Sequence, residues 1–459
     1  MLFTSRVFAV FALVVIPTFY AVPARLRPAF LLAASFAFYA WGDPWAVPLV
    51  SATIVWTWFC ALRGWTAASL VGSLGALAWF KYWNFAISSV EWAGSVDLAA
   101  LHTTPWLPIG ISFYTFHCAS YALDVRRGKL TAEPSLLYHA LYVMFFPQLV
   151  AGPVERAWWL LPQYHAGSVL TRERVRDGVF LVLLGFVKKV VFADRLADLI
   201  APRFHEPVKD ALVAWVGVLL FTTNIYLDFS AYSDIALGTA RLLGYDIRPN
   251  FDLPFVVPSI PERWRRWHIS MGSFFRDFVY IPLGGGRDGF WNTQRNVMIV
   301  MFLSGLWHGA SATFVVWGLL NGLSMVGHAV LEPALAVPRR WFGGHAVTRW
   351  AWFYVCCAVT TLMISAINVF FRSDSFEVAF SYVLAMVGGR TEGVLPVGYG
   401  LGLGCLALTA VVHEAERHWN VRKRIVDDPL VWGVLSWGML VFVLLLGTSG
   451  TRRFIYFQF

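Results

Sequence analysis

Two histidines, His268 and His308, are the side chains of this sequence best suited to chemistry. His308 lies in the segment 296–331, which contains no Asp, Glu, Lys or Arg, and His268 ends the run 264–268 (Trp-Arg-Arg-Trp-His). An imidazole ring titrates near neutral pH and can therefore accept and return a proton. Because the pair has no Cys or carboxylate at ligand spacing, it predicts acid–base chemistry and no metal site.

The segment that carries His308 must bend. It is 36 residues long, and a straight helix of that length would reach roughly 54 Å, whereas the hydrocarbon core of a bilayer is about 30 Å thick. We expect the break at the small residues 309–312 (Gly-Ala-Ser-Ala). An imidazole there needs a polar partner or a water-filled path, because an unpaired polar group in hydrocarbon costs several kcal/mol. A titratable group at such a break indicates a functional site.

The five residues before His268 include three arginines, Arg263, Arg265 and Arg266. Guanidinium groups bind phosphates through charge-assisted and often bidentate hydrogen bonds. The cluster is therefore a candidate site for the phosphates of coenzyme A or of a lipid headgroup. The sequence has no Walker motif, and the glycines 284–286 are too short a run for a phosphate loop.

His268 precedes His308 by 40 residues, one loop plus one span, so the two could face each other across a single cavity. Asp228, Asp234 and Asn296 are further polar residues in or beside apolar segments, and they are candidates for lining that cavity. Structural hydrogen bonding explains the two carboxylates equally well. The sequence shows no Gly-x-Ser-x-Gly elbow and no Ser/His/Asp arrangement, which argues against an autonomous serine esterase.

The composition places these residues in a membrane protein. Hydrophobic residues make up 58% of the chain and charged residues 14%, and the mean hydropathy is +0.61, whereas a soluble domain carries about 25% charged residues. Apolar segments occupy most of the 459 residues. We therefore predict an all-α polytopic membrane protein of one domain, residues 1–459, with about 11–13 membrane helices that include broken or re-entrant ones.

The net charge of +9 does not indicate a nucleic-acid partner, because Lys and Arg gather in the cytoplasmic loops of membrane proteins. The segment 241–295 mixes eight Arg and five acidic residues with aromatic residues. It is either an amphipathic segment at the cytoplasmic interface or a plain cytoplasmic loop. The five cysteines form no Cys-x-x-Cys pair, so neither a disulfide framework nor a zinc site is indicated.

Several motifs resemble those of the membrane-bound O-acyltransferase (MBOAT) family, in the branch of the alginate O-acetylation membrane protein and its D-alanyl-transferring relative. They occur in the order of the family and form a motif core at about 108–330. The matching stretches are 108–116 (PIGISFYTF), 145–153 (FFPQLVAGP), 226–234 (YLDFSAYSD), 264–270 (WRRWHIS), 276–277 (RD), 280–285 (YIPLGG) and 304–309 (SGLWHG).

The resemblance implies a ring of helices around a central funnel and a multi-pass location in the bacterial inner (cytoplasmic) membrane. It implies that His308 has the principal catalytic role and His268 a supporting one. The C-terminal sequence FIYFQF also resembles the tail of this branch, which makes Tyr456 a candidate acyl relay.

On this basis we expect an acetyl-CoA-dependent O-acetyltransferase without a permanently bound cofactor. Acetyl-CoA docks on the cytoplasmic side with its phosphates near Arg265 and Arg266, and His308 is the general base for an acceptor hydroxyl. The expected partners are membrane lipid, an extracytoplasmic acetyltransferase and a polysaccharide acceptor, as in alginate or another exopolysaccharide.

Two alternatives stay open at this point. A transporter or lipid flippase also has broken helices and intramembrane polar groups, although the sequence shows no internal repeat. An acyltransferase could instead modify a lipid or protein hydroxyl within the bilayer.

Overall fold

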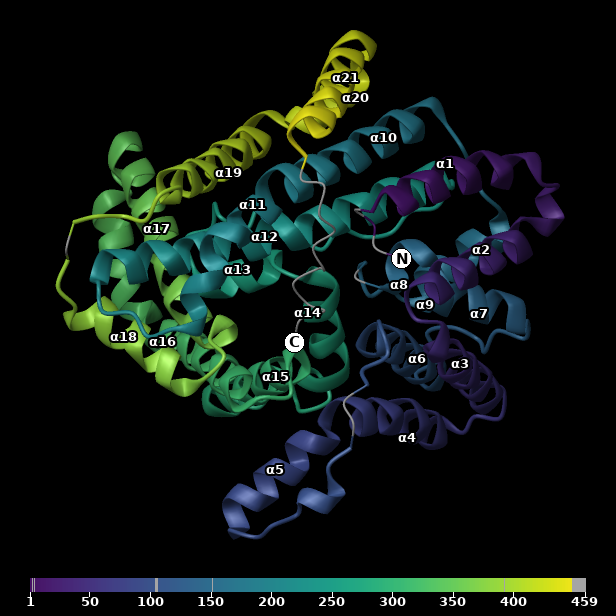
Figure 1. The fold of residues 1–459 in the computed structure, drawn as a ribbon, viewed down its shortest axis with the longest axis horizontal. Helices are drawn as coiled ribbons and strands as arrows, with labels where there is room; N and C mark the ends of the chain where they lie inside the picture. Colours follow the sequence, from purple (N-terminus) through teal and green to yellow (C-terminus); the bar gives the residue numbers. More distant parts are fainter. Residues whose placement is uncertain (2, 4, 104–105, 151, 392, 448–459) are drawn as a thin grey trace. The chain divides into compact units, whose positions relative to one another are not determined.

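The computed structural model describes all residues except 2, 4, 104–105, 151, 392 and 448–459 (Figure 1). The structure is 78% helical, and the described residues contain no β-strand. Among the described residues, five helices are long and apolar enough to cross a membrane, which confirms the prediction of an all-α polytopic membrane protein. They comprise Pro44–Leu62, Ala211–Leu242, Ala312–Pro338, Ala346–Arg372 and Pro429–Leu446.

The described chain divides into two compact units. The first contains Met1–Phe186 and Tyr232–Pro249. Its helices are α1 (Arg6–Ala21), α2 (Arg27–Gly42), α3 (Val47–Leu62), α4 (Thr66–Leu77), α5 (Trp83–Gly94), α6 (Ile111–Arg126), α7 (Leu136–Met144), α8 (Phe146–Leu149), α9 (Ala157–Ala166) and α10 (Arg172–Phe186), with the C-terminal part of α12 (Ala211–Leu242).

The second unit contains Val187–Ala231 and the chain from Asn250 onward, and it holds both histidines of interest. Its helices are α11 (Asp194–Ile200), the N-terminal part of α12, α13 (Ile260–Arg266), α14 (Ile269–Phe275), α15 (Phe290–His308), α16 (Ala312–Phe342), α17 (Ala346–Arg372), α18 (Phe376–Gly388), α19 (Tyr399–Trp419), α20 (Val421–Asp427) and α21 (Pro429–Leu446).

Short turns of other helical types join these elements. Three are wide π-helical turns, η3 (Ala78–Tyr82), η5 (Val187–Ala193) and η7 (Arg276–Tyr280). The 3₁₀ turns are η1 (Ala24–Leu26), η2 (Pro44–Ala46), η4 (Ala99–Leu101) and η6 (Ala201–His205).

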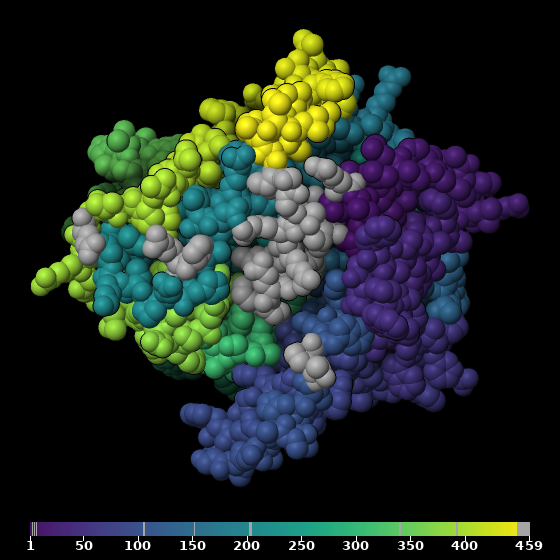
Figure 2. All heavy atoms as spheres, in the orientation of Figure 1, coloured from purple at the N-terminus to yellow at the C-terminus, as the bar shows by residue number. Residues whose placement is uncertain are grey.

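Two of the long apolar helices, α12 and α21, have opposite surroundings. In the most apolar window of α12, 78% of the residues are buried inside the protein, whereas in that of α21 only 6% are. The apolar side chains of α21 lie on the surface of the chain (Figure 2). A helix that exposes Leu, Val and Trp on most of its surface is suited to contact with lipid tails, which supports the multi-pass membrane assignment.

The chain breaks where the sequence predicted it. Helix α15 ends at His308 and α16 begins at Ala312, so the long uncharged segment forms two helices joined by a short turn. The two helices approach closely at a pair of glycines. A Cβ atom on Gly305 would lie 2.4 Å from the carbonyl oxygen of Phe314, and one on Gly318 would lie 2.4 Å from that of Met301. This close packing fixes the end of α15, and therefore the position of His308.

Candidate active site

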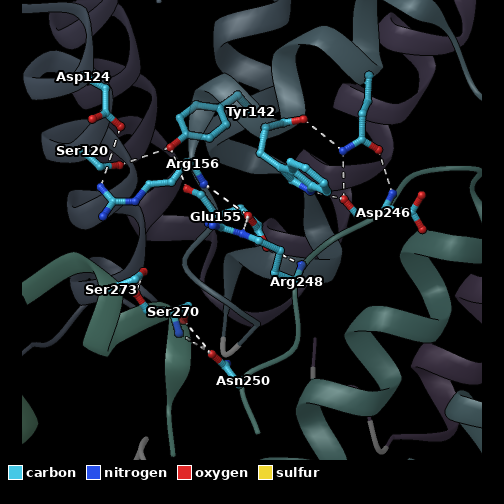
Figure 3. Close-up of polar contacts among 12 residues, drawn as sticks. Ser120, Asp124, Tyr142, Glu155, Arg156, Asp246, Arg248, Asn250, Ser270 and Ser273 are labelled. Carbon is cyan, nitrogen blue, oxygen red and sulfur yellow. Dashed lines mark hydrogen bonds and ion pairs between the residues drawn. The ribbon is translucent and has the colours of Figure 1, made fainter. Parts of the chain in front are cut away.

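The segment around His268 is held by Asn250, which lies in the same unit (Figure 3). The backbone N–H of Ile269 donates to the Asn250 carbonyl at 3.0 Å, and the Ser270 hydroxyl donates to Asn250 Oδ1 at 2.6 Å. A single antiparallel bridge also pairs Phe251 with Trp267. His268 itself has a left-handed backbone with φ +46°, a conformation that costs a non-glycine residue about 1–2 kcal/mol. The surrounding hydrogen bonds therefore determine the direction in which this histidine projects.

Both histidines border one cavity of about 470 Å³ in the second unit. The centroids of their rings are 6.5 Å apart, so a reacting group between them could contact both. Each histidine is otherwise buried, with 3% of His268 and 6% of His308 exposed. The remaining lining residues are Pro261, Trp264, Arg265, Trp267, Ile269, Met271, Gly272, Ser273, Phe275, Arg276, Tyr280, Val297, Val300, Met301, Ser304 and Met325.

Aromatic side chains enclose the ring of His308. Trp317 and Phe371 meet it edge to face at centroid distances of 5.0 and 5.3 Å. Trp317 is fixed in turn, because its Nε1 donates to Asn368 Oδ1 at 2.9 Å and Asn368 Nδ2 donates to the Thr222 hydroxyl at 3.1 Å. This chain of contacts was not predicted from the sequence. The only signal for it was a lone Asn in the apolar segment that became α17.

The ring of His268 packs edge-on against Phe229 at a centroid distance of 4.7 Å. His268 lies between two short helices, outside the five long apolar ones. Burial lowers the pKa of His268 to about 3, since a charged imidazole would lose its hydration there. The ring is therefore neutral at physiological pH and can serve as a hydrogen-bond partner without carrying charge.

The three predicted arginines have different surroundings. Arg263 is buried, donates to the carbonyl of Pro254, and has its guanidinium stacked on Phe255 and Trp267 at 4.6 and 4.8 Å. Arg266 forms ion pairs with Glu262 at 2.9 Å and Asp252 at 3.7 Å. The side chains of Arg263 and Arg266 are therefore engaged by the protein itself.

Arg265 is the member of the cluster that lines the cavity, and it is exposed. Arg276, which the sequence offered only as part of the matching stretch 276–277, also lines the cavity. Its side chain is 64% exposed, and its guanidinium pairs with Asp277 at 2.9 Å. We call Arg265 and Arg276 the cavity mouth. Its two guanidinium groups are suited to anions such as phosphates.

None of the three polar residues proposed as lining candidates is among those that border this cavity. Asp228 forms an ion pair with buried Lys189 at 2.5 Å. The side-chain amide of Asn296 donates to the carbonyls of Leu283 and Gly285 and so holds the glycine turn. Asp234 belongs to the first unit, and Tyr456 lies outside the described residues.

Within the described part of the chain, no group of three or more His, Cys, Asp or Glu side chains could hold a metal ion. The chemistry that the cavity offers is therefore that of imidazole rings, indole and hydroxyl donors and guanidinium groups. Such groups can move a proton and bind an anionic or carbonyl-containing ligand.

Comparison with known proteins gives a family and relatives. Residues 37–371 match the model of MBOAT, the membrane-bound O-acyltransferase family. The chain is 35% identical over 407 residues to the probable alginate O-acetylase AlgI of Azotobacter vinelandii, covering 84% of this chain and 78% of that protein. Over 437 residues it is 34% identical to the probable alginate O-acetylase AlgI of Pseudomonas aeruginosa, covering 90% and 80%. It is also 30% identical over 396 residues to the peptidoglycan O-acetyltransferase of Helicobacter pylori, covering 78% and 73%.

Proposed function

Because the chain belongs to the membrane-bound O-acyltransferase family, we propose that it moves an acetyl group from cytoplasmic acetyl-CoA to hydroxyls of an extracytoplasmic polysaccharide. The observation that carries this proposal is the shared cavity of His268 and His308, which has two guanidinium groups at its mouth. A thioester whose phosphates stay at the mouth could place its acyl end beside both imidazole rings.

In this mechanism His308 is the general base. Its ring takes the proton of the acceptor hydroxyl while the oxygen attacks the thioester carbonyl, and the proton then passes to the departing thiolate of coenzyme A. His268 is neutral and positions the acyl group or the acceptor by hydrogen bonding. Thioester-to-ester transfer needs no further energy source, so a route and a base are sufficient.

Arg265 and Arg276 bind the phosphates of coenzyme A in this proposal, through charge-assisted hydrogen bonds. In this proposal Arg276 replaces Arg266 as a phosphate ligand, because Arg276 lines the cavity and Arg266 does not. Acetyl-CoA is consumed as a substrate in this proposal, which assigns the protein no permanently bound cofactor.

The relatives support a glycan acceptor, because they include probable alginate O-acetylases and a peptidoglycan O-acetyltransferase. We further propose that the protein works in the bacterial inner membrane, surrounded by lipid. An extracytoplasmic acetyltransferase receives the acetyl group and completes its transfer to the polymer. Tyr456 is proposed as an intermediate acyl carrier on that route.

The test is a deletion strain complemented with the wild-type chain, with His308→Ala or with His345→Ala. His345 is a matched control, since it lies in the same unit but is exposed. Mass spectrometry of cell-surface glycans should find O-acetyl groups in the wild-type and His345→Ala strains and none in the His308→Ala strain, at equal protein level in the membrane.

Retained glycan acetylation in the His308→Ala strain would overturn the catalytic assignment. The His308→Ala strain could instead lose acetyl groups from a lipid or protein fraction while its glycans stay acetylated as in the wild type. That result would overturn the assignment of a polysaccharide acceptor and favour acylation within the bilayer.

A further inference from the structure

Trp264, on the short helix α13, borders two spaces at once. It lines the 470 Å³ cavity that holds both histidines. It also borders an adjoining space of about 20 Å³, together with residues that include Trp317 and Asn368. Trp264 therefore forms part of the wall between the cavity and the residues that support His308.

The indole nitrogen of Trp264 is buried, yet it has no hydrogen-bond partner among the described residues. An indole N–H can only donate, and leaving a buried donor unused costs about 1–3 kcal/mol. The neighbouring Trp317 is different, because its Nε1 donates to Asn368 Oδ1. The fold thus satisfies one of two adjacent tryptophans and leaves the other, at the cavity wall, with a hydrogen to donate.

The acyl-transfer chemistry requires a donor of this kind. When a hydroxyl attacks a thioester, the carbonyl oxygen becomes negatively charged, and a preorganised donor in a site without bulk water stabilises that charge. Other donors also line the cavity, among them the hydroxyls of Ser304 and Tyr280. What sets Trp264 apart from these is that its N–H is buried in the wall. The Ser273 hydroxyl already donates to the Ser270 carbonyl at 2.7 Å. Arg265 lies at the exposed mouth, where solvent screens its charge.

We infer that the indole N–H of Trp264 donates a hydrogen bond to the carbonyl oxygen of the acyl thioester and holds the oxyanion that forms there. This inference rests on the proposed function, because it takes the cavity to be the place of acyl transfer. It adds Trp264 to the two histidines as a catalytic residue.

The step is balanced without any further reactant. A bond forms between the acceptor oxygen and the carbonyl carbon, and the hydroxyl proton goes to the ring of His308. The oxyanion, held by Trp264, then re-forms the carbonyl as the carbon–sulfur bond breaks. The thiolate of coenzyme A leaves and takes the proton from the imidazolium.

The decisive experiment removes the hydrogen and keeps the ring. Trp264 is replaced with benzothienylalanine, in which a sulfur atom stands in place of the indole N–H. The probe is a ketone analogue of acetyl-CoA, with a methylene group in place of the thioester sulfur and an isotopic label on the carbonyl carbon. Infrared difference spectra of purified protein report hydrogen bonding to that carbonyl directly.

We expect the carbonyl stretch of the bound probe to lie at a lower frequency in the wild-type protein than in the Trp264 variant. The same replacement at Trp317 is the matched control, and it should leave the carbonyl frequency at the wild-type value, since the Trp317 N–H is bonded to Asn368. With acetyl-CoA as substrate, kcat of the Trp264 variant should fall on the order of 100-fold, while its affinity for the probe changes little.

An identical carbonyl frequency in the wild-type protein and the Trp264 variant would overturn the inference and leave the proposed function intact. So would an unchanged kcat in a variant whose probe affinity is normal. Failure of the wild-type protein to bind the probe would overturn both the inference and the assignment of acetyl-CoA as donor.

Discussion

Buried polar side chains in two regions, one in each unit, have different surroundings. In the first unit the buried charged groups face opposite charges: Asp124 lies 3.8 Å from Arg156, and Glu155 accepts a hydrogen bond from Arg248 at 2.9 Å (Figure 3). In the second unit the two histidines border a cavity and are surrounded mainly by aromatic rings. The first arrangement joins segments of the fold, whereas the second leaves room for a ligand.

Substitutions in the two regions should also have different effects. A buried ion whose partner is deleted stays behind as an uncompensated charge, which destabilises the protein strongly. A neutral imidazole carries no such charge, and glutamine can take its place in a cavity wall at little cost to the fold. We therefore expect substitutions in the first region to reduce stability and substitutions in the second to reduce turnover.

The largest effect on turnover should come from His308→Gln. Loss of the general base should lower kcat for acetyl transfer by about 10³-fold or more, because glutamine cannot accept the hydroxyl proton. The thermal unfolding midpoint in detergent should stay near that of the wild type. A kcat of the His308→Gln variant within roughly tenfold of the wild-type value would contradict a catalytic role for the second region.

Asp124→Asn tests the other side of the comparison. It removes the carboxylate charge that faces Arg156, whose side chain is only 2% exposed, so the free energy of unfolding should fall by about 3–5 kcal/mol. Asp374→Asn is the control, because 56% of the Asp374 side chain is exposed and its ion pair with Arg372 should contribute less than about 1 kcal/mol. Denaturant unfolding in micelles measures both variants. A similar loss in the two variants would contradict the view that buried charges hold the first unit together.

A third prediction concerns the dependence of stability on pH. The usual pKa of a histidine is about 6.5, and burial lowers that of His268 to about 3 in the folded protein. Between these values the unfolded chain binds a proton that the folded protein does not, so stability is lost as the pH falls below 6.5. From pH 6.5 to pH 5 this histidine should account for about 2 kcal/mol of that loss. Unfolding curves of wild type and His268→Gln measure it, and equal pH slopes in the two proteins would show that His268 is not buried in this way.

Asn368→Leu should have a smaller effect on turnover. It removes the acceptor of the Trp317 N–H and the donor to Thr222, so the ring that packs against His308 is less well held. We expect kcat to fall about tenfold with little change in KM, because a positioning contact of this kind contributes about 1–2 kcal/mol. Thr222→Val breaks only the outer bond and should cost less. A rise in KM with unchanged kcat would assign Asn368 to substrate binding instead.

The smallest effect is expected at the cavity mouth. Arg276→Ala should raise KM for acetyl-CoA about fivefold and leave kcat unchanged, because the lost contact is an exposed, charge-assisted one of about 1 kcal/mol. The difference from the wild type should shrink at high salt, which screens exposed charges. Arg287→Ala, at an exposed arginine that does not line the cavity, is the control. Equal KM values for the Arg276→Ala and Arg287→Ala variants would show that the cavity mouth does not bind acetyl-CoA.

The sequence predicted the helical class and the break after His308 because both follow from local physics. An uncharged segment longer than a bilayer is thick must be interrupted, and small residues mark the place. The spacing of His268 and His308 allows the two to face each other across one cavity, and the structure brings their rings together.

The contacts of individual side chains could not be predicted in the same way. Trp317 and Asn368 are 51 positions apart in the sequence, and no local pattern couples them. Likewise, the adjacent arginines Arg263, Arg265 and Arg266 look equivalent as a cluster, yet α13 turns one inward, one to the cavity and one to acidic neighbours. Partners of this kind depend on tertiary packing, which spacing alone does not specify.

The most direct test of the account is an electron cryo-microscopy structure of the protein in a lipid nanodisc with the ketone analogue of acetyl-CoA. The account predicts density for the acyl end between His268 and His308 and for the phosphates beside Arg265 and Arg276. Density for the analogue at any place that leaves this cavity empty would contradict it.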